Sequence, residues 1–262
     1  MSLSIDLSGR VAIVTGGGRG VGRGISERFL AAGAEVVICG RTQPETLPAA
    51  GGRRALFKAA DVRELEQIEA VAAFAEESFG RIDVLVNNAG GAPPADAATA
   101  SPRFHESILR LNLIAGLHFA QRANRTMQSQ ESGGVIISIT SVSGIRPSPG
   151  TAAYGAAKAG LESLTRSLAV EWGPKVRVVA VAGGMVRTEQ SDLYYGDAEG
   201  IAAVGATVPL GRIAEPGEIG DACVFLASPL ASYISGTTLL VHGGGERPAF
   251  LAAAKNTKPA GS

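Results

Sequence analysis

The feature that most restricts how this chain can fold lies near its start, where a short apolar segment runs into a glycine-rich loop and then a helix. Residues 10–15 read RVAIVT, the loop GGGRGVG follows, and GISERFLAAGA has helical character. Glycines let the loop turn tightly and approach a pyrophosphate, while the helix N-terminus supplies amide donors and the positive end of a dipole. Because Gly16, Gly20 and Gly22 stand between a strand and a helix, they predict a dinucleotide site rather than a mere tight turn.

The rest of the chain continues to alternate between short apolar strands and helices. Seven strands in this order imply one doubly wound parallel sheet with helices on both faces, a Rossmann-like α/β fold. No linker or shift in composition divides residues 1–262, which are expected to form a single domain. The strands are expected at 10–15, 35–41, up to 62, 82–86, 135–140, 175–182 and 237–242, and the main helices at 63–79, 103–128, 152–173 and 215–228.

Two segments depart from this alternation. Residues at about 189–212 lose the periodic pattern and contain Tyr194, Tyr195 and several glycines, which predicts a mobile lobe that covers a substrate. The tail, 246–262, follows the last strand and is polar at its end, so it is expected to fray.

A group of side chains suited to proton transfer lies within residues 141–158. Tyr154 and Lys158 are four residues apart, so at the start of a helix the phenol and the ammonium share one face. The ammonium is then expected to favour the phenolate and to lower the pKa of the tyrosine toward working pH. Ser141 precedes the pair across a loop rich in glycine and proline, and its hydroxyl is expected to reach the same substrate oxygen. Taken alone, such a pair is usually an ordinary helix-surface pair, and only the separate glycine loop favours catalysis.

The end of the second strand indicates which dinucleotide the site takes. An acidic residue there binds the ribose hydroxyls of NAD, whereas an arginine accommodates the extra phosphate of NADP. The acidic position is filled by Gly40, Arg41 follows, and Arg19 in the glycine loop adds a second cation. This pattern predicts NADP(H), the alternative being that both arginines simply face solvent.

The charge balance and the cysteine content of the chain argue against several other classes of protein. Basic and acidic residues balance at 24 each, so no net positive field favours nucleic acid or an anionic membrane. The apolar runs are far shorter than the ~20 residues of a membrane span. Cys39 and Cys223 are far apart, and His105, His118 and His242 share no metal-ligand spacing. The sequence shows no signal peptide. We therefore expect a cytoplasmic protein that acts on a small molecule and holds no metal.

The joint order of these motifs resembles the short-chain dehydrogenase/reductase family, in its compact single-domain form, over residues 6–245. The resemblance is carried by TGGGRGVG at 15–22, NNAG at 87–90, Ser141 with YGAAK at 154–158, and the stretch 209–244. It implies an oxidoreductase that transfers a hydride between NADP(H) and a secondary alcohol or ketone, including a 3-oxoacyl thioester or a steroid-like ketone.

The same resemblance implies a role for each matching residue. Tyr154 would be the proton donor or acceptor, Ser141 would orient the substrate carbonyl, and Lys158 would lower the tyrosine pKa and hold the nicotinamide ribose. Asn112 would anchor a water for proton relay. Besides Tyr154 and Lys158, the cofactor would be held by Gly16, Arg19, Gly20, Val21, Gly22, Arg41, Asp61, Val62, Asn88, Ala89, Gly90, Val186 and Thr188.

Two positions depart from the family pattern, and three other functions compete with the leading one. Gly183-Gly184 stands where Pro-Gly is usual, which suggests a looser turn near the carboxamide, and His242 stands where the family often has Asp. An NAD(H)-dependent alcohol dehydrogenase of the same family is the first alternative. A nucleotide-binding scaffold without catalysis is the second, disfavoured by the intact Ser141, Tyr154, Lys158 and Asn112. An isomerase or dehydratase is the third, disfavoured because the sequence shows no extra acid/base pair and no enlarged carboxyl-terminal domain.

The resemblance also implies a homotetramer that pairs through the helices at 103–128 and 152–173. Small and apolar residues surround much of the second helix, which independently suggests a partner on its outer face. They are Ala153, Ala156, Ala157, Ala159, Leu161, Leu164 and Leu168.

Overall fold

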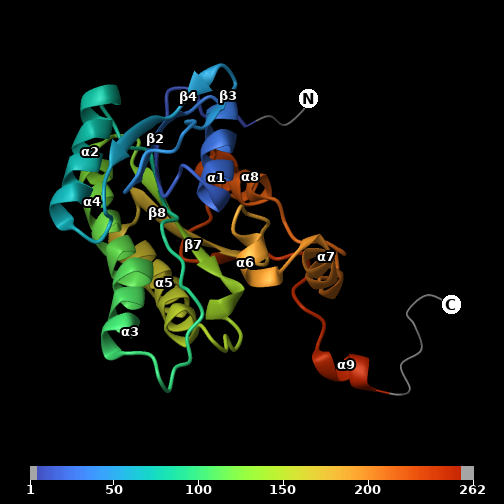
Figure 1. Cartoon of the computed structure of the whole chain (residues 1–262). Helices are drawn as coiled ribbons and strands as arrows, with labels where there is room; N and C mark the ends of the chain where they lie inside the picture. Colours follow the sequence, from blue (N-terminus) through green and yellow to red (C-terminus); the bar gives the residue numbers. More distant parts are fainter. Residues whose placement is uncertain (1–4, 255–262) are drawn as a thin grey trace.

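The computed structural model describes residues 5–254 and confirms the doubly wound fold (Figure 1). Seven parallel strands form one sheet in the order β5-β2-β1-β6-β7-β8-β9. The order runs outward in both directions from the neighbours β1 and β6, so the crevice at their carboxyl ends is where such a sheet binds its ligand. The strands are β1 (Val11–Thr15), β2 (Glu35–Gly40), β5 (Leu56–Ala59), β6 (Val84–Asn87), β7 (Gly134–Ser141), β8 (Val176–Gly183) and β9 (Thr238–Val241).

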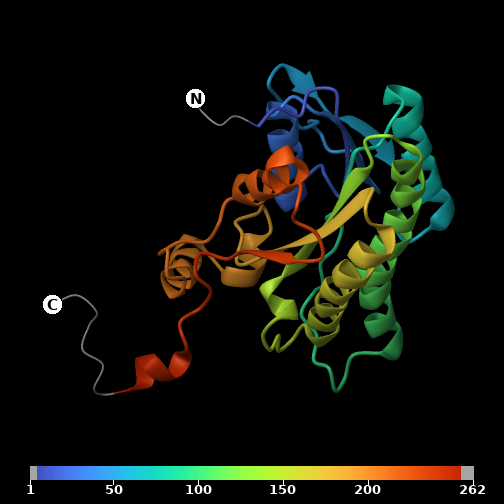
Figure 2. The ribbon, with the colours of Figure 1, turned by 180° about the vertical axis from the view of Figure 1, so that it is seen from behind.

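Each face of the sheet has its own apolar core, because successive strand residues point to opposite sides. Val14 packs on one face with Phe29, and Ile13 packs on the other with Phe119. Figure 2 shows these two helical layers from behind. The first face is covered by α1 (Gly20–Ala31) and α8 (Pro216–Ala227), and the second by α2 (Leu65–Phe79), α4 (Ala115–Ser129) and α5 (Ala152–Trp172).

The helix expected at 103–128 is interrupted near its middle. It consists of α3 (Pro102–Leu109), a π-helical turn η1 (Arg110–Ile114) and α4. Ala115 N–H donates to the carbonyl of Arg110, five residues earlier, and Asn112 lies inside this turn. Such insertions occur often at functional sites. Apolar periodicity does not reveal them, because the flanking turns keep the helical pattern.

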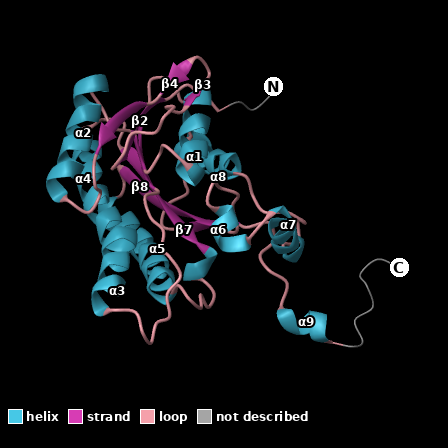
Figure 3. Ribbon diagram, in the orientation of Figure 1, coloured by secondary structure: helices cyan, strands magenta, loops and turns pink. Residues whose placement is uncertain are grey.

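The expected irregular lobe is instead partly helical. It contains α6 (Ser191–Tyr195) and α7 (Ala198–Thr207), which stand beside the sheet rather than on it (Figure 3). The Asp197 carboxylate caps α7 by accepting hydrogen bonds from the amides of Glu199 and Gly200. Local capping therefore forms helices where the apolar periodicity is weak.

Two further features lie outside the main sheet. A two-stranded hairpin, β3 (Ala49–Ala50) with β4 (Arg53–Arg54), follows β2 and was not expected from the sequence. A short helix, α9 (Ala249–Ala253), stands apart from the body of the protein below α7 (Figure 1). Of the tail that was expected to fray, residues 255–262 lie outside the described part of the chain.

Within residues 5–254, no helix is long and apolar enough to cross a bilayer. The same residues place no group of three His, Cys, Asp or Glu side chains where it could hold a metal ion. Cys39 and Cys223 are free thiols buried in the cores on opposite faces of the sheet.

Candidate active site

The glycine loop lies in the crevice, between β1 and α1. Gly16 and Gly20 have φ values of +65° and +49°, in the left-handed region that glycine adopts without strain. A Cβ on Gly22 would lie 2.3 Å from the Gly16 carbonyl oxygen, and one on Gly17 would lie 2.5 Å from the Ile38 side chain. The side chain of the N-cap, Arg19, does not cap the amides of α1. A tight backbone with uncapped helical amides fits the phosphates of a dinucleotide.

The NNAG turn after β6 is locked against this loop. The Thr15 hydroxyl accepts hydrogen bonds from the amides of Asn88 and Ala89, both at 2.9 Å. The Asn88 side chain donates to the Thr15 carbonyl at 2.8 Å. The Asn88 amide group therefore supports the loop, and the backbone at Ala89 and Gly90 is what remains to face a cofactor.

The adenine end of the crevice holds one carboxylate and several cations. Asp61 accepts a hydrogen bond from Arg63 Nε at 2.9 Å. That bond is the main reason why the pKa of Asp61 falls to about 2, and the charge of Arg41 contributes to the same shift. Arg41 therefore lies near Asp61 at the end of β2, and Arg41 and Arg19 are both exposed. The sequence did not predict the Asp61–Arg63 pair.

Ser141, Tyr154 and Lys158 meet beside the crevice. Ser141 ends β7, while Tyr154 and Lys158 occupy the first turns of α5. The Ser141 hydroxyl lies near the Tyr154 phenol and lowers the pKa of that phenol. Lys158 is only 4% exposed, its Nζ donates to the Ile139 carbonyl at 2.8 Å, and it lies 5.3 Å from the centroid of the tyrosine ring.

The predicted direction of the tyrosine pKa shift is wrong for this structure. Burial raises the pKa of Tyr154, the Ser141 hydroxyl lowers it, and the phenols of Tyr194 and Tyr195 raise it further. Lys158, whose ammonium donates to the Ile139 carbonyl, is not among the main causes of this shift. Burial also lowers the pKa of Lys158, to about 8. Tyr154 is consequently a neutral phenol near pH 7, the form that donates a proton.

Asn112 joins the site through the loop after β6. Its side chain is 2% exposed, accepts from Gly91 N–H at 2.8 Å, and donates to the carbonyls of Gly91 and Ile108 at 2.9 and 3.0 Å. A Cβ on Gly90 would lie 2.6 Å from Asn112 Oδ1 and 3.4 Å from Lys158 Nζ. The polar groups of this buried side chain are therefore satisfied within the protein. Its role in a water relay stays a prediction, because both side-chain donors are already used.

The loop after β8 reaches the glycine loop, so the expected carboxamide contacts lie near the crevice. Val186 forms a β-bridge with Ala214, and a Cβ on Gly20 would lie 3.4 Å from the Thr188 methyl group. Gly183 is the last residue of β8 and is aligned with Ser141 of β7. The glycine that replaces the usual proline therefore belongs to the sheet, and the looser turn expected there is not found.

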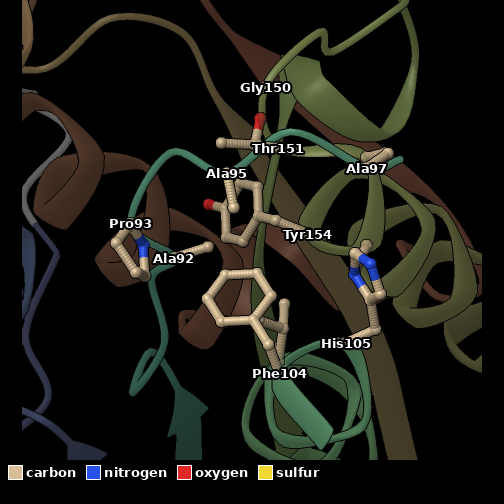
Figure 4. A pocket seen from close by; sticks show the side chains of 12 residues that line it. Ala92, Pro93, Ala95, Ala97, Phe104, His105, Gly150, Thr151 and Tyr154 are labelled. Carbon is tan, nitrogen blue, oxygen red and sulfur yellow. The ribbon is translucent and has the colours of Figure 1, made fainter. Parts of the chain in front are cut away.

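An apolar pocket adjoins the tyrosine (Figure 4). Figure 4 shows the Tyr154 ring in its middle, with Phe104 and His105 of α3 beside it. The opposite wall comes from the loop after β6, whose residues here are small. The lining residues are Ala92, Pro93, Ala95, Ala97, Phe104, His105, Ile108, Gly150, Thr151, Ala152, Ala153 and Tyr154.

Several contacts at the site were not predicted. Arg146, in the loop after Ser141, forms an ion pair with Glu246 at 2.6 Å and so ties that loop to the segment after β9. The Glu189 carboxylate accepts a hydrogen bond from Gly20 N–H. Nothing in the local sequence signals either contact, since the partners are about a hundred or more residues apart.

Comparisons with known proteins agree with this geometry. Residues 16–246 match the family model described as enoyl-(acyl carrier protein) reductase. A 3alpha-hydroxysteroid dehydrogenase of Mediterraneibacter gnavus is 37% identical over 246 residues, which cover 90% of this chain and 97% of that protein. Among solved structures, a short chain dehydrogenase/reductase family protein is 38% identical, with a TM-score of 0.81 and coverage of 92% and 98%. The ligand-free aldohexose dehydrogenase of Thermoplasma acidophilum is 30% identical, with a TM-score of 0.86 and coverage of 98% and 100%.

Proposed function

Because the chain belongs to the short-chain dehydrogenase/reductase family, we propose that it uses NADP(H) to interconvert a secondary alcohol and a ketone, with Tyr154 as the proton-transferring group. Members of this family are NAD(P)-dependent oxidoreductases that act on alcohols and ketones. The observation that carries the proposal is the neighbouring hydroxyls of Ser141 and Tyr154, with the Lys158 ammonium against the tyrosine ring, beside a glycine cradle for phosphates.

The chain's own residues account for the proton. When bound, the nicotinamide ring gives or takes the hydride at the carbonyl carbon. Ser141 and Tyr154 direct two hydroxyls at one substrate oxygen, and Tyr154 donates its proton as that oxygen gains charge. The buried Lys158 ammonium then stabilises the phenolate that remains. Oxidation of the alcohol uses the same groups in the reverse order.

The pocket beside Tyr154 supports a ketone with an apolar body. Alanines, a proline and the Phe104 ring form much of its wall, and His105, Thr151 and Tyr154 supply its polar side chains. Burial of apolar surface is therefore the main interaction available to a substrate there. Steroid-like ring ketones and 3-oxoacyl thioesters both carry such a body, and Tyr194 and Tyr195 on α6 complete the proposed substrate lobe.

A panel of carbonyl compounds tests the function. NADPH oxidation would be followed with a steroid ketone, a 3-oxoacyl thioester, a short aliphatic ketone and an aldose. We expect turnover with at least one apolar ketone and little with the sugar. Tight NADPH binding without turnover of any of them would support the scaffold alternative instead.

We propose in addition that the protein is a homotetramer. Leu161 and Leu168 of α5 are buried. Its exposed positions include the small residues Ala156 and Ala159 as well as Arg166, with Val170 84% exposed further along. A face of small residues allows close packing of a second helix. β9 is the edge strand and exposes Leu239 and Leu240 by 36% and 47%, which is an unusual apolar edge for a monomer.

Light scattering at micromolar concentration measures the assembly directly. We expect a mass about four times the 26.6 kDa of the chain. Two isologous interfaces, one at α5 and one at β9, would give a D₂ tetramer. Leu240→Glu should reduce the mass to that of a dimer, because a buried unpaired charge is costly. A parent protein that scatters as a monomer would contradict the proposal.

A further inference from the structure

The first amide of α1 is bound by a carboxylate from a distant part of the chain. Gly20 N–H donates to Glu189 Oε2 at 3.1 Å and to Oε1 at 3.3 Å. The helix has no side-chain cap of its own from Arg19 and no acidic residue in its first turn. Glu189 therefore supplies the anion that the positive end of this helix favours.

This amide belongs to the glycine cradle that suits a dinucleotide phosphate. A phosphate oxygen and a carboxylate oxygen both accept from the same N–H, and two anions at hydrogen-bond distance from one amide repel each other. Occupation of Gly20 by Glu189 and occupation by a phosphate therefore exclude one another.

The Glu189 carboxylate is bound weakly enough to be displaced from the Gly20 amide. Glu189 is exposed, and within residues 5–254 it forms no ion pair. A hydrogen bond in such an exposed place contributes little net stability, because water replaces it readily. The contact is thus a displaceable occupant of the site rather than a permanent part of the fold.

Glu189 projects from a turn that leads directly into the proposed substrate lobe. Thr188 N–H donates to Ser191 Oγ at 2.8 Å, and Ser191 N–H donates to the Thr188 carbonyl at 3.0 Å. Ser191 is buried and begins α6, whose tyrosines raise the pKa of Tyr154. The bond between Glu189 and Gly20 therefore joins the start of α1 to the turn that leads into α6, beside the catalytic phenol.

We propose that Glu189 is an internal competitor for the dinucleotide phosphate, which latches the loop after β8 to α1 until the cofactor displaces it. The inference rests on the proposed function, since it assumes that the glycine cradle binds NADP(H). Part of the protein is closed to the cofactor at any moment, so the measured affinity is lower than that of the open site. The latch also means that cofactor binding precedes adjustment of the lobe over the substrate.

Isothermal titration of NADPH into the full-length protein tests the latch without relying on turnover. Glu189→Gln keeps the size of the side chain and a neutral acceptor for Gly20, but removes the charge. We expect it to bind NADPH about tenfold more tightly than the parent protein at low salt. The gain should shrink in 0.5 M salt, because exposed charges are screened within about one Debye length.

Asp192→Asn is the matched control, because it removes the same charge from an exposed residue three positions further along. It should leave the NADPH affinity within about twofold of the parent value. Equal affinity of Glu189→Gln and the parent, weaker binding by Glu189→Gln, or an equal gain from Asp192→Asn would each overturn the latch. Failure of the parent protein to bind either NADPH or NADH would instead overturn the proposed function. Equal melting temperatures would show that both variants are folded.

Discussion

Tyr154→Phe is expected to lower the turnover number by about 100-fold or more while leaving NADPH affinity nearly unchanged. The substitution removes only the phenol oxygen, which in the proposed mechanism donates the proton to the substrate, and general acid/base groups usually contribute on this scale. The aromatic ring, its contact with Lys158 and its place in the apolar pocket are all retained. The measurement is kcat with the best ketone of the panel, together with the dissociation constant of NADPH.

The control for this variant is Tyr233→Phe, which removes a hydroxyl from a fully exposed tyrosine after α8. It should keep parental kcat, and both variants should melt as the parent does. A Tyr154→Phe protein that retains most of its turnover rate would show that another group moves the proton. Loss of NADPH binding along with turnover would mean that the phenol holds the cofactor rather than the substrate oxygen.

Gly40→Asp is expected to reverse the preference from NADP(H) to NAD(H). The carboxylate would bind ribose hydroxyls and repel the extra phosphate that Arg41 and Arg19 accommodate. Each arginine paired with that phosphate contributes ~1.5–3 kcal/mol as a charge-assisted hydrogen bond, which corresponds to at least about tenfold in kcat/KM. There is room for the new side chain, because a Cβ on Gly40 meets only the Thr42 carbonyl oxygen, at 3.8 Å.

The quantity to compare is the ratio of kcat/KM with NADPH to that with NADH, in the parent and in the variant. Gly40→Ala serves as the control, since it adds the Cβ without the charge and should keep the parental ratio. If the parent already used NADH as well as NADPH, the arginines would face solvent and the first alternative from the sequence, an NAD(H)-dependent dehydrogenase, would hold.

The fold could be predicted from the sequence because strands, glycine loops and helices are each indicated by residues that are close together in the chain. Apolar runs such as GVIISI predicted the strand that ends at Ser141, and the strand, glycine loop and helix at the start of the chain predicted where the crevice lies. The elements that the sequence did not predict are short. The π-helical turn at Arg110–Ile114 inserts a residue without disturbing the apolar stripe, and α6 and α7 have too few buried positions to show one.

Local sequence patterns predicted only part of the candidate site. The spacing of Tyr154 and Lys158 predicted their shared helix face, and the loop before Tyr154 predicted that the Ser141 hydroxyl lies near the phenol. The sequence did not predict the direction of the tyrosine pKa shift, since that direction depends on how deeply the phenol is buried and on where the ammonium points. The Ile139 carbonyl holds that ammonium, and a backbone acceptor leaves no trace in a sequence motif.

The sequence by itself thus determined the order of the strands and helices, the glycine cradle and the pair of residues proposed to transfer the proton, because each depends on residues close together in the chain. Only the tertiary structure decided that Tyr154 is held as a neutral phenol, that Asp61 is paired with Arg63, and that Glu189 binds the first amide of α1. These properties arise from burial and from contacts such as that between Gly20 and Glu189, 169 residues apart, which come into being only when the sheet brings its carboxyl ends together.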